Sequence, residues 1–162
     1  MAKTIPDDLF PPLSMAVGQM VLSWSFVEVS LDQWVAIIYQ GAGGRNLAEE
    51  IPRALTRKIK FLRRCFRNIA ALDPFAEEAT KLLDRAKEIS EIRHTVVHGY
   101  ISKYEPHTQT VTFVKLDAEK DIHRRFEIPL TFPQLLDAGG KCLDLSTDFT
   151  SFTKRLTDSF AV

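Results

Sequence analysis

A long run of apolar residues, spaced alternately by four and three positions, most constrains how this chain can fold. The run consists of Leu13, Val17, Met20, Trp24, Val27, Leu31, Trp34 and Ile38. Apolar side chains at this spacing lie on one face of an α-helix, and that face must be buried against other elements. The glycine-rich residues 41–44 predict where the helix ends. We therefore expect a bundle of helices, preceded by an N-terminal arm over residues 1–12.

Two further stripes of the same spacing predict a second and a third helix. The second helix is expected to begin near Pro52, with an apolar stripe of Leu55, Ile59, Leu62, Phe66 and Ile69. The third is expected to be capped by Asp73, with an apolar stripe of Phe75, Ala79, Leu82, Ala86 and Ile89. Arg93 takes the next position of that stripe, where a buried charge needs a partner or a cleft. We expect this helix to end at His98, with Gly99 in the left-handed conformation.

Residues 100–130 differ in character from the helical segments. The ranges 111–113 and 126–130 alternate as short strands do, and residues 104–107 are typical of a turn. We expect a small antiparallel hairpin or meander inserted between the third and fourth helices.

A fourth helix is expected after Thr131 and Gln134, which fit a capping box. Its inward-facing residues are predicted to be Leu135, Cys142, Leu145, Phe149, Phe152 and Leu156. The predicted fold class is mainly α: an antiparallel bundle of about four helices with a β insertion, organised as a single domain over residues 1–162.

Composition and cysteine usage are those of an ordinary soluble protein. The chain has 162 residues, 45% of them hydrophobic, and a formal net charge of zero, so the whole molecule is not an evident polyanion binder. Cys65 and Cys142 have no metal-ligand spacing and are interpreted as core residues in a reducing compartment. We find no signal peptide and no run of ~20 apolar residues, so we predict a cytoplasmic protein without a membrane partner.

Positive charge is concentrated on the predicted second helix. A basic stripe at 4, 3, 4, 3 spacing consists of Arg53, Arg57, Lys60, Arg64 and Arg67. It lies about 200° around the helix from the apolar stripe, which makes it a candidate RNA-binding surface. The alternative is a solvated face that pairs with acidic residues of the third helix.

The segment Arg93-His94-Thr95-Val96-Val97-His98-Gly99-Tyr100 carries the chemistry-bearing residues. A guanidinium binds phosphate and an imidazole exchanges protons near neutral pH, which together suit RNA cleavage. The alternative is structural, because Arg and His near a helix C-terminus interact favourably with the helix dipole. His94 and His98 also have the spacing of metal ligands, but no Glu follows His94 and no third ligand is evident. His107 and His123 lie in the predicted β region, so we predict no metal and no cofactor.

Residues 93–98 resemble the signature of the HEPN superfamily, an arginine and a histidine separated by four to six residues. The resemblance implies a helical bundle that pairs as a homodimer, and an endoribonuclease that needs no metal. By that analogy His98 acts as general acid or base and Arg93 holds the scissile phosphate. His94 either orients that phosphate or supports the residues that contact it. Glu28 is a candidate polar partner of Arg93, and Ser25 is a weaker one. The β insertion departs from the minimal family pattern.

Tyr100 extends the signature to Arg-x4-His-x-Tyr, which is similar to the toxin of nucleotidyltransferase–HEPN toxin–antitoxin pairs. The resemblance implies an RNA substrate, an antitoxin partner and a regulatory role for Tyr100. One alternative is a HEPN-like module without catalysis that binds a partner protein or a nucleotide. Another is a helical bundle unrelated to that superfamily.

Overall fold

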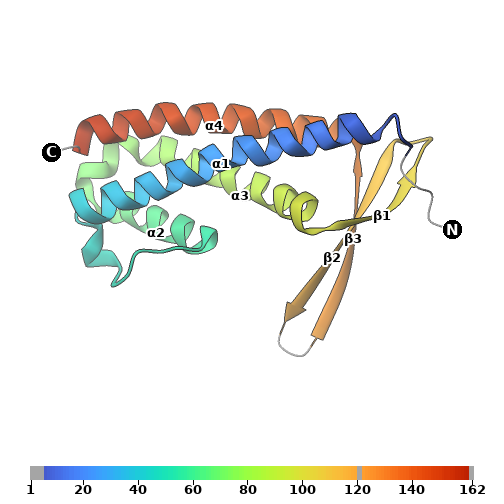
Figure 1. Ribbon diagram of the computed structural model, residues 1–162. Helices are drawn as coiled ribbons and strands as arrows, with labels where there is room; N and C mark the ends of the chain where they lie inside the picture. Colours follow the sequence, from blue (N-terminus) through green and yellow to red (C-terminus); the bar gives the residue numbers. More distant parts are fainter. Residues whose placement is uncertain (1–5, 120–121, 161–162) are drawn as a thin grey trace. The chain divides into compact units, whose positions relative to one another are not determined.

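The structure is a computed structural model that describes residues 6–119 and 122–160. Its described residues form four α-helices and one three-stranded antiparallel sheet, which is inserted between the third and fourth helices (Figure 1). The helices are α1 (Phe10–Gly41), α2 (Leu55–Asn68), α3 (Asp73–His98) and α4 (Phe132–Phe160). The strands are β1 (Tyr100–Glu105), β2 (Thr110–Glu119) and β3 (Ile122–Thr131). The predicted fold class, mainly α with a β insertion, is confirmed.

The chain divides into two compact units, and three of the helices contribute to both. The first, here called the sheet unit, comprises the residues up to Ser23 together with Ile89–Leu143. The second, the aromatic unit, comprises Trp24–Glu88 and the residues from Asp144 onward. The single-domain organisation stays a prediction.

The aromatic unit is built around Trp34. Its indole ring stacks on Phe149 with centroids 4.6 Å apart and lies 4.4 Å from the ring of Phe152. Phe66 from α2 meets Trp34 edge-on, with ring centroids 6.2 Å apart. Trp34, Phe149 and Phe152 are fully buried, as their positions on the predicted stripes require. Aromatic contacts of this geometry add to the stabilisation from burial alone.

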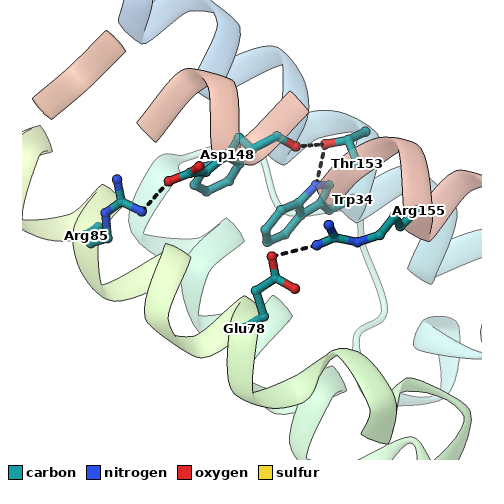
Figure 2. A network of polar contacts seen from close by, with 7 residues as sticks. Trp34, Glu78, Arg85, Asp148, Thr153 and Arg155 are labelled. Carbon is teal, nitrogen blue, oxygen red and sulfur yellow. Dashed lines mark hydrogen bonds and ion pairs between the residues drawn. The ribbon is translucent and has the colours of Figure 1, made fainter. Parts of the chain in front are cut away.

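Polar contacts within the aromatic unit link α1, α3 and α4 (Figure 2). The Trp34 indole N–H donates to the Thr153 hydroxyl at 2.7 Å, and that hydroxyl donates to the Phe149 carbonyl at 2.7 Å. At the surface, Arg85 pairs with Asp148 and Arg155 pairs with Glu78, each at 2.6 Å. The buried indole therefore keeps a hydrogen bond while its ring packs in the core.

The sheet unit contains a meander in which β2 pairs with β1 on one side and with β3 on the other. The β1–β2 register runs from Tyr100 opposite Val114 to Glu105 opposite Thr110, with an irregularity between Ile101 and Lys103. The β2–β3 pairing is longer, so these two strands continue as a ribbon beyond the last pair with β1 (Figure 1).

A capping box at Thr131 starts α4, as predicted. The backbone N–H of Thr131 donates to the Gln134 side-chain oxygen at 2.8 Å, and the Gln134 N–H donates to the Thr131 hydroxyl at 3.3 Å. The six residues of α4 predicted to face inward are all buried. The helix therefore begins and faces as its sequence indicates.

Five local predictions are corrected by the structure. The N-terminal arm does not extend to residue 12, because α1 already begins at Phe10. The second helix begins at Leu55 rather than near Pro52, because the backbone of Ala54 is extended. Asp73 is not a cap: a short 3₁₀ turn, Ala70–Leu72, leads directly into α3, and Asp73 is already helical.

The other two corrections concern the turn and the end of α3. The turn after β1 lies at residues 106–109, with Gln109 at φ 50°, because Tyr104 and Glu105 pair with β2. Gly99 does not have a positive φ; among the described glycines only Gly43 does, at 85°. The helix stop at Gly41 is as predicted.

Helix α1 is long and apolar enough to cross a membrane by length and composition. Its most apolar 18-residue window has a mean hydropathy of 1.3, and 44% of that window is buried inside the structure. The sequence prediction concerned an unbroken run of ~20 apolar residues, which α1 does not contain, and the cytoplasmic location stays a prediction. A core helix has the same composition, and the stripe through Trp24, Val27 and Trp34 is buried.

Candidate functional site

The end of α3 is held close to the sheet by a glycine. The Gly99 N–H donates to the Thr95 carbonyl at 2.8 Å, which closes the last helical turn. A Cβ at Gly99 would lie 2.5 Å from the Thr95 oxygen and 3.3 Å from the Val114 oxygen. Only a residue without a side chain fits where the chain passes from α3 into β1. Gly99 is therefore required by close packing rather than by a left-handed conformation.

His94 and His98 lie together on the exposed side of the last turns of α3. Their ring centroids are 4.7 Å apart, with an angle of 50° between the ring planes. Both residues are exposed. Residues four apart on a helix are neighbours on its surface, so the regular helix alone brings these imidazoles together.

Arg93 is placed differently from the two histidines. It is half-buried, as its position on the apolar stripe of α3 predicts. Its Nε atom is buried and has no hydrogen-bond partner in the part of the chain that the structure describes. A buried polar atom without a partner costs roughly 1–3 kcal/mol, so this position needs an explanation.

The structure therefore brings together two of the three predicted catalytic residues. His94 and His98 are exposed neighbours, whereas the Nε of Arg93 faces the protein interior. Residues five apart on a helix point about 140° apart, which accounts for this difference. The side chains of Arg93 and His98 therefore leave α3 in different directions.

The two residues predicted to support the site, Tyr100 and Glu28, belong to different units. Tyr100 begins β1 and is 53% exposed, two residues after His98. Glu28 lies half-buried on α1, within the aromatic unit. Its pairing with Arg93 stays a prediction, as does the weaker suggestion for Ser25.

The charge of Arg93 acts on a buried thiol of the sheet unit. Burial raises the pKa of Cys142 to about 11, and the positive charge of Arg93 partly opposes this rise. The Cys142 thiol donates a weak hydrogen bond to the Met20 carbonyl at 3.6 Å. The predicted role of Cys142 as a core residue is consistent with its complete burial.

The basic stripe of the second helical segment is exposed along its length. Arg53, Arg57, Lys60, Arg64 and Arg67 are all exposed, although Arg53 precedes the first residue of α2. Arg64 donates to the Leu47 carbonyl at 2.9 Å. None of the five forms an ion pair with a carboxylate among the described residues. The side chains that do pair are two others of α2: Lys58 with Asp32, and Arg63 with Asp84.

Among the described side chains, His107 does not complete a metal site with His94 and His98. In the described part of the chain, no group of three or more His, Cys, Asp or Glu side chains could hold a metal ion. His107 is exposed in the turn after β1. His123 lies on β3, and its side chain is outside the described residues.

Two features of this molecule were not predicted from its sequence. The first is the crowding at Gly99, whose only sequence signal was a glycine at a helix end. The second is a groove between α1 and α4, lined in part by the exposed side chains of Phe26 and Val29. The signal for it was the near absence of charge from α1, whose only charged residues are Glu28 and Asp32.

Comparison with known proteins identifies no relative of this chain. No protein-family model matches the chain, and neither a curated protein nor a solved structure matches it.

Proposed function

We propose that this chain is a HEPN-like endoribonuclease that acts as a homodimer and needs no metal. The observation that carries the proposal is the end of α3, where Arg93 precedes the exposed imidazole pair His94–His98 and its buried Nε has no hydrogen-bond partner among the described residues. The order of the helices and the position of the motif at the end of the third helix support the same proposal, whereas the meander departs from the minimal family pattern.

The lack of a partner for Arg93 favours a functional over a structural role. An arginine kept for stability at a half-buried position is normally paired with a carboxylate, because an unpaired buried charge is costly. In the described part of the chain, the buried Nε of Arg93 has no hydrogen-bond partner, a carboxylate included. Its charge therefore remains available for a phosphate, the anion that guanidinium groups bind best in a two-point geometry.

The paired imidazoles supply what cleavage of RNA by internal transesterification requires. One imidazole takes the proton of the ribose 2′-hydroxyl, and the 2′-oxygen attacks the adjacent phosphorus. The bond from phosphorus to the 5′-oxygen breaks, and a second imidazole returns a proton to that oxygen. The products are a 2′,3′-cyclic phosphate and a free 5′-hydroxyl. We assign the base to His98 and the proton donor or phosphate-orienting role to His94.

A homodimer resolves the divergence of Arg93 from the two histidines. Because the side chain of Arg93 leaves α3 about 140° away from that of His98 and its Nε is buried, we place the guanidinium and the imidazoles of one composite site on two chains. A second copy that faces the first can supply the missing group. Arg93 then stabilises the charge that develops on the phosphate in the transition state.

The exposed basic stripe is proposed to contact RNA outside the cleaved bond. Arg53, Arg57, Lys60 and Arg67 combine exposure with the absence of ion pairs to the described carboxylates. Cations of this kind bind the phosphate backbone without sequence preference, and their contribution falls with salt concentration.

Tyr100 is proposed as the point of regulation. Its side chain is 53% exposed and two residues from His98, so an antitoxin protein can reach its hydroxyl. Modification of that hydroxyl with a nucleotide would add negative charge beside the imidazoles and compete with RNA for Arg93.

The proposal is tested by incubating the purified protein with RNA in EDTA and analysing the product ends. We expect cleavage with 2′,3′-cyclic phosphates, reduced roughly 10²–10⁴-fold by His98→Ala and about 10²–10³-fold by Arg93→Ala. His107→Ala is the matched control, because it removes an exposed imidazole that lies in the turn after β1 and not on α3. This variant should retain full activity. Circular dichroism checks that each variant remains folded.

Two outcomes contradict the ribonuclease. Either the folded parent protein cleaves no RNA, or His98→Ala and His107→Ala lose the same small amount of activity. The divergence of Arg93 from His98 favours one alternative, a HEPN-like module that binds a partner protein or a nucleotide without catalysis. In that case the same substitutions weaken binding of the partner, and the parent has no cleavage to lose.

A further inference from the structure

The basic stripe, Arg53 to Arg67, belongs entirely to the aromatic unit, and all of its five members are exposed. The two other cations of α2 have a different role. Lys58 pairs with Asp32 of α1, and Arg63 pairs with a carboxylate of α3. These pairs hold α2 with one face toward the unit and the opposite face toward solvent. The helical part of the stripe, from Arg57 to Arg67, is therefore a straight row of exposed cations roughly 15 Å long.

The stripe is unfavourable for the helix that carries it. Helix α2 contains no Asp or Glu. Successive members of the stripe are three or four residues apart, which is the spacing at which like charges on a helix repel. Arg57 also lies in the first turn of α2, near the positive end of the helix dipole. The fold alone does not account for this arrangement, whereas an anion bound along the row would relieve the repulsion.

The carboxylates of α3 do not supply that anion. Glu77 pairs with Lys81 on its own helix, and Glu78 pairs with Arg155 of α4. In the part of the chain that the structure describes, no carboxylate forms an ion pair with a member of the stripe. The described contacts therefore leave the charge of the stripe for a ligand.

The exposed face of α2 suits a phosphate backbone rather than unpaired bases or a membrane. Proteins that bind single strands stack the bases on accessible aromatic side chains, but both aromatic residues of α2, Phe61 and Phe66, are buried. An amphipathic helix that lies in a membrane surface needs a free apolar face, and the apolar face of α2 is buried as well. A row of cations without stacking groups matches a backbone whose bases are already paired.

We infer that the basic stripe binds the phosphate backbone of a base-paired RNA stem, and that the substrate is a stem joined to an unpaired segment. This inference rests on the proposed function in taking RNA as the ligand. Attack by the 2′-oxygen requires that oxygen to lie in line with the phosphorus and the leaving 5′-oxygen, which the regular geometry of a stem does not allow. The stem is therefore the part that is bound, and the unpaired segment is the part that is cut.

Fluorescence anisotropy with 2′-O-methyl RNA tests the binding, because this RNA forms stems but has no 2′-hydroxyl through which it could be cleaved. We expect the full chain to bind a blunt duplex roughly 10-fold more tightly than an unstructured single strand, for whose bases the stripe has no stacking partner. A duplex of unrelated sequence should bind equally, since phosphates carry no sequence information. Equal affinity for the single strand, or no binding of the duplex, overturns the inference.

Two double variants of equal charge test the stripe itself. Arg57→Gln/Lys60→Gln removes two charges from the stripe. It should weaken duplex binding roughly 10-fold or more, and reduce the slope of log affinity against log salt by about 0.9 for each lost phosphate contact. Lys141→Gln/Lys154→Gln removes two exposed charges from α4 and should change neither quantity.

A stability measurement separates lost binding from lost folding. Because Arg57→Gln/Lys60→Gln relieves repulsion within α2, urea unfolding should show this variant to be at least as stable as the parent. If the stripe variant and the α4 variant weaken duplex binding equally, the stripe is not the site. If poly-glutamate displaces the duplex at an equal concentration of charge, the stripe is assigned to an acidic protein instead.

The same samples separate this inference from the ribonuclease. A parent that binds the duplex through the stripe but cleaves no RNA in EDTA supports the stem site and overturns the ribonuclease. A parent that cleaves RNA but binds duplex and single strand equally overturns the stem site and leaves the roles of Arg93 and His98 in place.

Discussion

The aromatic unit and the sheet unit satisfy their polar groups to different degrees. In the aromatic unit the buried indole N–H of Trp34 reaches the Thr153 hydroxyl, and that hydroxyl reaches a carbonyl in turn. In the sheet unit the Nε of Arg93 is buried without a partner among the described residues. The satisfied indole of Trp34 is what a stable core requires. The buried Nε of Arg93 instead lowers the stability of the fold, so its position needs an explanation other than stability.

The two units also differ in how their backbones are constrained. The aromatic unit depends on side chains that fill space, with Trp34, Phe149 and Phe152 in mutual contact. The sheet unit depends at one point on the absence of a side chain, where Gly99 joins α3 to β1. We therefore expect a substitution in one unit to disturb that unit more than the other.

The largest effect is expected from Trp34→Ala, which removes the centre of the aromatic cluster. Replacement of a buried tryptophan by alanine typically costs about 3–5 kcal/mol of unfolding free energy. Urea unfolding followed by circular dichroism measures the loss.

Phe113→Ala, at a buried position of the sheet unit, is the matched substitution. It should expose Cys142 to thiol reagents while Cys65 stays protected. Equal exposure of both thiols in Phe113→Ala would show that the two units open together.

A smaller effect is expected from Gly99→Ala in the sheet unit. The added Cβ would lie 2.5 Å from the Thr95 oxygen, so the end of α3 must shift, at a cost of about 2 kcal/mol. Gly140→Ala is the control, because its Cβ meets nothing within 4 Å and it lies inside α4. That variant should gain about 0.5–1 kcal/mol, as measured by urea unfolding. If both variants are equally stable, the close approach at Gly99 is not a constraint.

The smallest effect concerns pH. Burial raises the pKa of Cys65 and of Cys142 from 9.0 to about 11, partly opposed by Arg64 and Arg93 respectively. The folded state therefore keeps these protons while the unfolded state loses them. Stability is fully present below pH 9 and falls as the pH rises toward 11, by about 1 kcal/mol per thiol at pH 10.

Single alanine variants assign this loss to each unit, because Cys65 lies in the aromatic unit and Cys142 in the sheet unit. Urea unfolding at pH 8 and at pH 10 should show a smaller pH effect in Cys65→Ala and in Cys142→Ala than in the parent. If a variant loses as much unfolding free energy between pH 8 and pH 10 as the parent does, the thiol removed in that variant does not titrate as its burial requires.

The helices were predictable because their signals are repeated and local. The stripe from Leu13 to Ile38 repeats the same spacing over many turns, and only a helix accommodates it. The pair Thr131 and Gln134 specifies a helix start within four residues. The start of α2 was displaced because Pro52 suits a first turn but does not require one, and the extended Ala54 follows it.

The features of the site were less predictable because they depend on residues distant in sequence. The strand β1 shows little alternation of its own and forms by pairing with β2. The crowding at Gly99 involves Val114, on a strand that had no predicted register. The proximity of His94 to His98 followed from helical geometry alone, whereas the missing partner of Arg93 depends on what packs around α3.

The placement of the two tryptophans has a consequence for spectroscopy. The chain has only Trp24 and Trp34, and both are buried in the aromatic unit. Intrinsic tryptophan emission is therefore a signal from one unit, and the end of α3 with its histidines can loosen without changing it. An unfolding curve recorded by emission alone would report the protein as native while the residues proposed for catalysis were already out of place.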